Sequence, residues 1–490
     1  MNASPEDPTL LWYDYETTGI DPAVDRPLQF AARRTTLALE PVGAPVNLWC
    51  RLPPDVLPHP EACLLTGIAP QHVERDGLAE AEFAAQIHAA LAQPGTCSVG
   101  YNTVRFDDEI NRHLFYRNFF DPYAHTWQDG TSRWDIIDLV RGCYALRPEG
   151  IEWPRYEDGR PCFKLDRLAP ANRLDQAHAH DAGSDVTATI ALARLIRSRQ
   201  PKLYEWHFAA QDKNVVAMRM QPALQAAEML VHVSSRYPSE RGGLALVVPL
   251  AQVPDRKPGS AWIVADLTID PEAWMQLAPD DLRERLFTRR EDLPDDVTRP
   301  PLKTVQANRV PFIAPPSVLR DADAERLGID VAAARRNLET LRACSGLRER
   351  VEAVFRDGVA AHPAHTDPEL ALYGGFLNDA DRRACERTRN MAPEALRAPG
   401  VHFEDARLRE LLFRYRARNW PDSLGADELP RWQDYVRDRL SGRIDDRMLT
   451  LDQYRAAIAQ LRETTLAGAG QAMLDQLEAW GMDTAARWGL

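Results

Sequence analysis

Short apolar runs alternate with amphipathic stretches over residues 10–200, and this alternation restricts the segment to folds that combine a sheet with helices. Apolar side chains at helical spacing predict helices at 106–120 and 182–198. Apolar runs bounded by turn-forming residues predict strands at 10–13, 29–37 and 97–101. Strands and helices mixed in this way indicate an α/β fold, with helices on both faces of a sheet.

The rest of the chain divides into two further parts. Pro201 ends the α/β segment, and residues 202–355 mix strand-like runs with proline-rich loops and a helical addition at 321–350. This mixture predicts a β-rich domain. A short polar segment at 360–367 is a second expected linker, and helical periodicity dominates after it. We therefore place three domains at 10–200, 201–355 and 360–488.

Composition excludes several classes of protein. The 490 residues are 44% hydrophobic and 27% charged, which is ordinary for a globular chain, and no apolar run reaches the roughly 18 residues of a membrane helix. The N-terminus lacks the basic start and apolar core of a signal peptide, so we expect a cytoplasmic protein. Seven scattered cysteines without a C-x-x-C pair predict reduced thiols. The net charge of −13 argues against non-specific coating of nucleic acid, although an acidic body can carry a local basic groove.

Three acidic motifs lie where the expected strands end or the expected helices begin. Asp14 and Glu16 stand two apart beside the first strand, so their carboxylates point to one face and offer oxygen ligands to a hard cation such as Mg²⁺. Asp107 opens a helix, His180 precedes the next one, and Asp185 lies one turn inside it. Taken singly, these residues read equally well as a solvated strand end, a helix cap or a structural histidine.

In combination, the three motifs resemble those of the DEDDh 3′–5′ exonucleases, because D-x-E, N-x-x-x-F-D and H-x-x-x-x-D occur in the right order on the right elements. Further stretches are similar to bacterial exodeoxyribonuclease I, and they extend over most of the chain. They include Arg26-Pro27, Gln29-Phe30-Ala31-Ala32, Leu65-Thr66-Gly67-Ile68, Gly100-Tyr101-Asn102, Phe115-Tyr116-Arg117-Asn118-Phe119, Asp379-Ala380-Asp381-Arg382 and Tyr415-Arg416-Ala417-Arg418-Asn419. The resemblance implies a ribonuclease H-like nuclease domain with a mixed sheet, then an SH3-like β-rich domain and an all-α C-terminal domain, which together enclose the substrate strand.

Phosphodiester hydrolysis needs an activated water and stabilisation of the charge that develops on the phosphate, and two divalent ions about 3.5–4 Å apart can supply both. We expect Asp14, Glu16 and Asp185 to hold two Mg²⁺ ions, with Mn²⁺ as a substitute. Asp107 would bind metal directly or through water, and His180 would be the general base. Without metal, the clustered carboxylates would repel one another and become partly protonated.

The resemblance also implies an activity and the residues that bind the substrate. The implied reaction is processive 3′-to-5′ hydrolysis of single-stranded DNA to 5′-mononucleotides, in DNA repair and recombination, with Glu16 touching the terminal nucleotide. Basic and aromatic side chains interleave over 112–141, a combination that binds single strands by stacking and phosphate contact. The resemblance selects Arg112, Tyr123, Trp127 and Arg141 there and adds Lys164 near the cleaved end. Because the chain contains only five lysines, Lys213, Lys257 and Lys303 are further candidates.

A protein partner is implied as well. The resemblance places basic contacts for the acidic C-terminal tail of single-stranded DNA-binding protein at Arg147 and Arg320. Arginine clusters at 335–342 and 414–418 are additional candidates for this site. We expect a monomer.

Two other functions compete with this interpretation. A DEDDh exonuclease acting on RNA would share the motifs, but such chains are typically a nuclease domain alone, whereas this chain has about 290 further residues. A catalytically dead nucleic-acid-binding scaffold would not need all five of the acidic and histidine positions that are present here.

Overall fold

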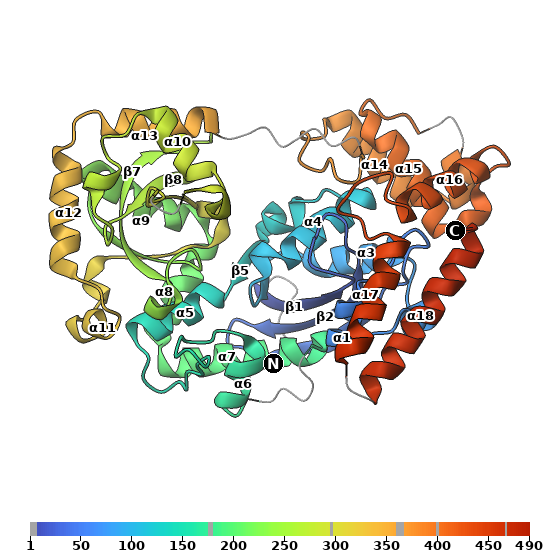
Figure 1. Ribbon diagram of the computed structural model, residues 1–490, viewed down its shortest axis with the longest axis horizontal. Helices are drawn as coiled ribbons and strands as arrows, with labels where there is room; N and C mark the ends of the chain where they lie inside the picture. Colours follow the sequence, from blue (N-terminus) through green and yellow to red (C-terminus); the bar gives the residue numbers. More distant parts are fainter. Residues whose placement is uncertain (1–6, 175–179, 295–296, 359–366, 398–400, 466–467) are drawn as a thin grey trace. The chain divides into compact units, whose positions relative to one another are not determined.

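The computed structural model describes residues 7–174, 180–294, 297–358, 367–397, 401–465 and 468–490 (Figure 1). The expected linker at 360–367 lies almost entirely outside this part of the chain. The chain forms two compact units. The first comprises 1–132, 176–187 and 362–490, and the second comprises 133–175 and 188–361.

A mixed five-stranded sheet forms the centre of the first unit, as the α/β pattern predicts. Its strands lie in the order β3-β2-β1-β4-β5. β1 pairs antiparallel with β2 and parallel with β4, and β2 pairs antiparallel with β3. The strands are β1 (Thr9–Thr17), β2 (Pro27–Thr36), β3 (Pro41–Trp49), β4 (Thr96–Gly100) and β5 (Ser132–Asp135), where the chain passes into the second unit.

The alternation of β1 decides which side chains enter the core and which remain for chemistry. Leu11, Tyr13 and Tyr15 point to the face covered by α3 (Glu80–Leu91) and α4 (Asp107–Arg117), where they form one apolar core with Phe83 and Phe115. Side chains alternate along a strand, so Asp14 and Glu16 lie on the opposite face. α1 (Pro60–Thr66) and α2 (Pro70–Asp76) connect β3 to α3.

The C-terminal helices pack directly on the sheet-containing segment of the same unit. One shared core joins Phe119 of that segment to Phe403 and Tyr415, and a second joins Cys63 to Trp432 and other residues of the C-terminal part. The helices are α14 (Asp379–Asn390), α15 (Ala406–Asn419), α16 (Glu428–Leu440), α17 (Leu451–Thr464) and α18 (Ala469–Trp488).

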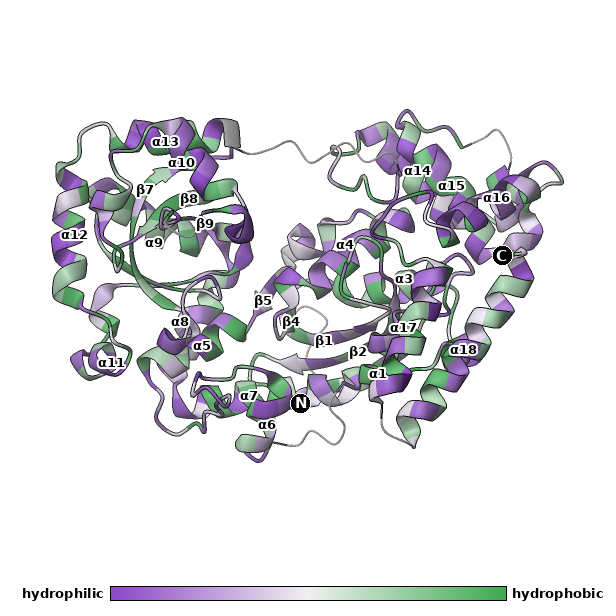
Figure 2. Ribbon diagram, in the orientation of Figure 1, coloured by the Kyte–Doolittle hydropathy of each residue, from purple (hydrophilic) through white to green (hydrophobic). Residues whose placement is uncertain are grey.

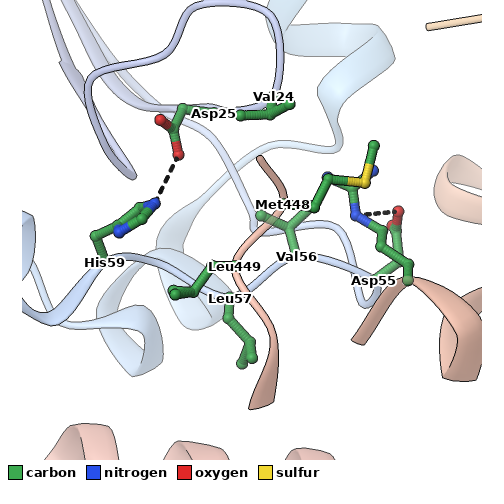
Figure 3. A pocket seen from close by; sticks show the side chains of 9 residues that line it. Val24, Asp25, Asp55, Val56, Leu57, His59, Met448 and Leu449 are labelled. Carbon is green, nitrogen blue, oxygen red and sulfur yellow. Dashed lines mark ion pairs between the residues drawn. The ribbon is translucent and has the colours of Figure 1, made fainter. Parts of the chain in front are cut away.

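A buried ion network ties these two parts together. Glu369 contacts Arg26 at 2.5 Å, Arg418 at 2.7 Å and Arg414 at 3.2 Å, and Arg418 also contacts Asp55 at 2.7 Å. Figure 3 shows Asp55 and its ion pair with an arginine of α16, beside a small pocket that also holds an Asp25–His59 pair. Residues more than 300 positions apart therefore share one polar core, in which each buried carboxylate has guanidinium partners.

The second unit contains an antiparallel sheet in the order β10-β6-β7-β8-β9, and it confirms the prediction of a β-rich part. Figure 2 shows apolar strands β7 and β8 at its centre, consistent with buried residues such as Leu246 of β7 and Ile263 of β8. The strands are β6 (Leu230–Val233), β7 (Leu244–Gln252), β8 (Ala261–Asp266), β9 (Leu302–Gln306) and β10 (Phe312–Ala314). Six helices precede α11 in this part of the chain, and the third of them begins in the first unit: α5 (Ile137–Leu146), α6 (Leu165–Ala171), α7 (Ala182–Arg199), α8 (Pro201–Phe208), α9 (Lys213–Ala226) and α10 (Pro279–Phe287).

The single helical stretch expected at 321–350 is instead three helices: α11 (Asp321–Arg326), α12 (Val331–Ala343) and α13 (Leu347–Gly358). Gly328 and Gly346 interrupt it, with φ of +64° and +70°. Glycine adopts this left-handed backbone without steric cost, which explains the end of α11 before Gly328. α12 ends slightly earlier than its glycine, at the extended residue Cys344.

Two further expectations concern the whole chain. All seven cysteines are free thiols and six of them are buried. Among the described residues, no helix combines the length and apolar character that crossing a bilayer requires.

Candidate functional site

Three carboxylates from two elements converge on the face of the first sheet that is opposite α3 and α4. Asp14 and Glu16 come from β1, and Asp185 comes from the first turn of α7. One oxygen of each lies within 4.8 Å of an oxygen of the other two. A hard divalent cation takes carboxylate oxygens as ligands, so this group of three fits such an ion. The structure thus brings together the three residues expected to bind metal.

Burial and mutual repulsion raise the pKa values of these carboxylates. Burial first, and then the negative charges of Asp107, Glu16 and Asp185, raise the pKa of Asp14 well above its ordinary value. Burial and the neighbouring carboxylates likewise raise the pKa of Glu16 to about 9. Like charges this close cannot all ionise, which agrees with the expected partial protonation. A bound cation would favour the charged forms and lower these pKa values.

Asp107 is the fourth carboxylate of the site. It opens α4, is only 4% exposed, and accepts a hydrogen bond from the backbone N–H of Tyr15 at 3.2 Å. Tyr15 lies between the two metal candidates of β1, so this bond fixes the start of α4 beside them. Two tyrosine hydroxyls strengthen the connection from β1 to α4: Tyr13 to Asp108 at 2.8 Å and Tyr15 to Asn111 at 2.7 Å. Asp108 therefore anchors the strand to α4.

His180 precedes α7 by two residues and is half-buried. Its φ of +63° is uncommon for a residue with a side chain, although histidine tolerates this region better than most. Such backbone conformations cluster at functional sites. His178, the other histidine of this stretch, lies outside the described residues.

The candidate DNA-binding residues of the first unit gather around one tyrosine. The Arg112 guanidinium lies 5.5 Å from the ring centroid of Tyr123, and it also pairs with Glu109 at 2.5 Å. The ring of Phe376 meets that of Tyr123 edge-on at 5.7 Å, and the hydroxyl of Tyr373 accepts from Arg112 at 3.2 Å. Trp127, also selected from the sequence, is 61% exposed.

Tyr373 and Phe376 were missed by the sequence analysis. Phe376 is 83% exposed, which is unusual for so large an apolar side chain and typical of a binding surface. The available sequence indication was a pair of aromatic residues flanking two glycines in a loop, Tyr373-Gly374-Gly375-Phe376. We call Arg112, Tyr123, Tyr373 and Phe376 the aromatic cluster.

The candidate phosphate contacts of the second unit differ in how they are held. Lys164, Lys213 and Lys257 are exposed, which suits a phosphate contact but does not select them for one. Arg141 pairs with Asp138 at 2.7 Å, and Lys303 donates to the Nε2 atom of His232 at 3.0 Å. Burial and the nearby Lys303 charge lower the pKa of His232, so its ring is neutral and can accept this hydrogen bond.

The two arginines proposed for the protein partner lie beside the same carboxylate. Arg320 contacts Asp323 at 2.5 Å and Glu149 at 2.7 Å, while Arg147 lies 4.0 Å from Asp323. The side chains of Arg320 and Arg147 are 40% and 31% exposed. They remain accessible to an acidic ligand, although each already has a carboxylate nearby.

The suggestion that Arg414, Arg416 and Arg418 contribute to that partner site is wrong. Their side chains are only 4–6% exposed, because each forms a buried ion pair. Arg416 pairs with Glu428 at 2.7 Å, and the other two belong to the network around Glu369. Arginines at this spacing on a helix are typical of a solvent-exposed face, but in the structure this face of α15 is buried.

Family models match three consecutive parts of the chain. An exonuclease model covers 11–193, the exonuclease I SH3-like domain covers 211–357, and the exonuclease I C-terminal domain covers 366–484. Exodeoxyribonuclease I of Escherichia coli (strain K12) is 43% identical over 460 residues, which is 93% of this chain and 95% of that protein.

Solved structures agree over nearly the whole length. Exonuclease I from Methylocaldum szegediense is 46% identical with a TM-score of 0.91, covering 97% of this chain and 99% of that one. E. coli exonuclease I in complex with a dA16 oligonucleotide has a TM-score of 0.92 at 40% identity, covering 98% and 100%. A structure of SSB/exonuclease I with the inhibitor CFAM has a TM-score of 0.89 at 39% identity, covering 98% and 100%. On this similarity and the intact carboxylate site, the chain belongs to the exodeoxyribonuclease I family and is an exonuclease.

Proposed function

We propose that this protein is a processive, single-strand-specific 3′-to-5′ DNA exonuclease that releases 5′-mononucleotides in DNA repair and recombination. The observation that carries the proposal is the convergence of Asp14, Glu16 and Asp185 within 4.8 Å, with Asp107 beside them. Relatives crystallised with single-stranded oligonucleotides support the substrate class. The three-part division at 10–200, 201–355 and 360–488 remains part of this proposal.

In this mechanism the four carboxylates and His180 have separate tasks. Asp14, Glu16 and Asp185 would hold two Mg²⁺ ions, or Mn²⁺ in their place, and Asp107 would add a fourth carboxylate directly or through water. When bound, such ions supply charge neutralisation at the phosphate and an activated water. His180 would take the proton of the attacking water on an imidazole nitrogen. Glu16 would also contact the terminal nucleotide.

The single strand would be held by stacking and by phosphate contacts. Trp127 and the aromatic cluster offer exposed rings, and Arg112 adds a positive charge beside Tyr123. The proposed phosphate contacts in the second unit are Arg141, Lys164, Lys213, Lys257 and Lys303. The net charge of −13 would oppose non-specific coating of nucleic acid. A basic groove confined to the substrate path would still bind a single strand.

Alanine at Phe376 should weaken single-stranded DNA binding by about 1–3 kcal/mol, the usual contribution of a base stacked on an aromatic ring. The same change at Trp127 should have an effect of this size, because its ring is also largely exposed. Fluorescence anisotropy with labelled oligo-dT in EDTA measures the affinity without cleavage. Met482→Ala, another exposed apolar residue at 59%, is the matched control. Equal affinity in all three variants would remove both rings from the DNA-binding surface.

A second binding site would recruit the acidic C-terminal tail of single-stranded DNA-binding protein. Arg147 and Arg320 lie beside one carboxylate in the second unit and remain partly exposed. The SSB/exonuclease I structure among the relatives supports this class of partner. We propose that the protein is a monomer in the cytoplasm, where seven free cysteines would stay reduced.

Arg320→Ala should reduce affinity for that acidic tail peptide, because a charge-assisted hydrogen bond typically contributes about 1.5–3 kcal/mol. Hydrolysis of short oligonucleotides should be unchanged, since Arg320 belongs neither to the carboxylate site nor to the proposed DNA contacts. Anisotropy of a labelled peptide at two salt concentrations tests this, with Arg289→Ala, an 80% exposed arginine of the same unit, as the control. An unaffected Arg320→Ala variant would exclude this residue from the peptide site.

The substrate class is tested by offering the wild-type protein single-stranded DNA, double-stranded DNA and RNA of one sequence with Mg²⁺. We expect rapid degradation of the single-stranded DNA and little degradation of the other two substrates. Preference for RNA would favour the competing RNA exonuclease, and no degradation of any substrate would favour the binding scaffold.

A further inference from the structure

Gln29 of β2 is a fully buried polar residue next to the carboxylate site. In the β1–β2 pairing it stands directly opposite Glu16. Directly opposed residues of an antiparallel pair project their side chains on the same face, with Cβ atoms about 4.5–5.5 Å apart. The amide of Gln29 therefore lies on the face that carries the metal candidates.

The hydrogen bonds of Gln29 lead away from its own sheet to α7. Its Nε2 atom donates to a carboxylate oxygen of Asp181 at 3.2 Å, and its Oε1 atom accepts from the backbone N–H of Ala182 at 3.3 Å. The second Nε2 hydrogen goes to Asn47 on β3 at 3.0 Å. Two of the three partners thus open α7, and one side chain joins the sheet to the amino end of that helix.

The same turn of α7 carries the proposed catalytic residues. The other carboxylate oxygen of Asp181 accepts from the backbone N–H of Ser184 at 2.9 Å, as an N-cap does, and its carbonyl oxygen accepts from Asp185 at 3.0 Å. Asp185 is therefore rigidly connected to the residue that Gln29 holds. His180 immediately precedes Asp181, so its place also depends on this anchor.

A residue needed only to fill the core would not require an amide. Burying an amide is unfavourable unless its hydrogen bonds are made, and here both donors and the acceptor are used. The Asp181 carboxylate lies at the amino end of α7, four residues before Asp185, and its two oxygens accept from Gln29 and from Ser184. Gln29 keeps this carboxylate engaged with hydrogen-bond donors.

We propose that Gln29 is a positioning residue of the nuclease site, whose amide sets where His180 and Asp185 stand relative to Asp14 and Glu16. It touches neither the substrate nor the metal in this role. The inference rests on the proposed function, because it assigns Gln29 to the support of those catalytic residues.

The test is Gln29→Met in the full-length protein, which keeps the side-chain volume and removes all three hydrogen bonds. Loss of a residue that hydrogen-bonds to a metal ligand typically lowers metal affinity or activity by about 10–100-fold. The kcat on oligo-dT should therefore fall by that factor, and the Mg²⁺ concentration needed for half-maximal activity should rise. KM for DNA should be unchanged, because the DNA-binding surface is intact. Mn²⁺ binding followed by electron paramagnetic resonance without DNA should weaken in parallel.

Thr35→Val is the matched control. Thr35 lies on the same strand, is fully buried, and accepts a hydrogen bond from the indole of Trp12 at 2.9 Å, away from α7. This variant should lower Tm about as much as Gln29→Met does while its kcat and metal affinity stay at the wild-type values.

A charge-conserving exchange supplies a second test. Gln29→Glu should be more damaging than Gln29→Met, because it places another carboxylate beside Asp181. Adding Asp181→Asn restores the hydrogen bond in the reverse direction, because the new amide at 181 can donate to the new carboxylate at 29. The kcat of the double variant should therefore be at least about tenfold higher than that of Gln29→Glu, which is within the range typical of residues that support metal ligands.

Three results would overturn the proposal. These are wild-type kcat and Mn²⁺ affinity in Gln29→Met, a raised KM with unchanged kcat, or no recovery in the double variant. An inactive wild-type protein would instead contradict the proposed function itself, so the two failures can be told apart.

Discussion

Asp185→Asn should reduce exonuclease activity at saturating Mg²⁺ by more than about 100-fold, since even outer partners of metal ligands often cost 10–100-fold. The substitution keeps the shape of the side chain and removes a negative charge from the group formed with Asp14 and Glu16. The residual positive charge of a bound ion would then be less well compensated, and metal affinity should fall. Initial rates on labelled oligo-dT over a range of Mg²⁺ concentrations measure both effects.

Asp452→Asn is the matched control for this experiment. Asp452 also lies in the first turn of a helix, α17, but its side chain is 97% exposed and does not belong to the group of three carboxylates. It should affect only the helix dipole, by about 0.3–1 kcal/mol of stability, without changing activity. Wild-type rates in Asp185→Asn would exclude Asp185 as a metal ligand.

Glu369→Gln should destabilise the protein by about 3–5 kcal/mol, the usual cost of removing one partner from a buried ion pair. Glu369 is 1% exposed and contacts Arg26, Arg414 and Arg418, so its loss leaves buried guanidinium groups without their carboxylate. The midpoint of urea unfolding measures the change. Asp379→Asn, which breaks an exposed pair with Arg382, should cost at most about 1 kcal/mol.

The same network predicts a pH dependence. Burial works to raise the pKa of Glu369, but the surrounding guanidinium groups hold it well below its ordinary value of 4.5. A lowered folded-state pKa stabilises the fold above the unfolded value and loses this contribution as the pH falls below about 4.5. The wild-type protein should therefore lose more stability between pH 6 and pH 3 than Glu369→Gln does. Parallel losses in both proteins would argue that Glu369 is not charged in the fold.

Local patterns predicted the placement of the carboxylates well, because each motif is short and lies on one element. The i, i+2 spacing of Asp14 and Glu16 directed both carboxylates to one face of β1, and the position of Asp185 one turn inside a helix is visible from periodicity alone. Their mutual approach required the family resemblance, since periodicity does not reveal how α7 meets the sheet. The contact that fixes this approach, from Gln29 to Asp181, joins residues 152 positions apart.

The buried ion pairs between residues far apart in the sequence could not be predicted from the sequence. Arg414 and Arg418 stand one helical turn apart, a spacing that suits a solvated face as well as a buried one, and their partners Asp55 and Glu369 lie far away in the sequence. An exposed aromatic ring such as Phe376 was equally invisible, because apolar residues in a loop are normally expected to be buried. Both features depend on the packing of the C-terminal helices on the sheet-containing segment.

The most direct test of the central claim is a time course on one single-stranded DNA that carries different labels at its two ends, with Mg²⁺ and with EDTA. We expect the 3′ label to appear first, as a 5′-mononucleotide, and the 5′ label to be released only when the strand has been consumed. EDTA should stop both. If an excess of unlabelled DNA is added after the start, the protein should still digest to the end the labelled strands to which it is already bound. Release of the 5′ label first, or equal rates in EDTA, would contradict a metal-dependent 3′-to-5′ nuclease built on Asp14, Glu16 and Asp185.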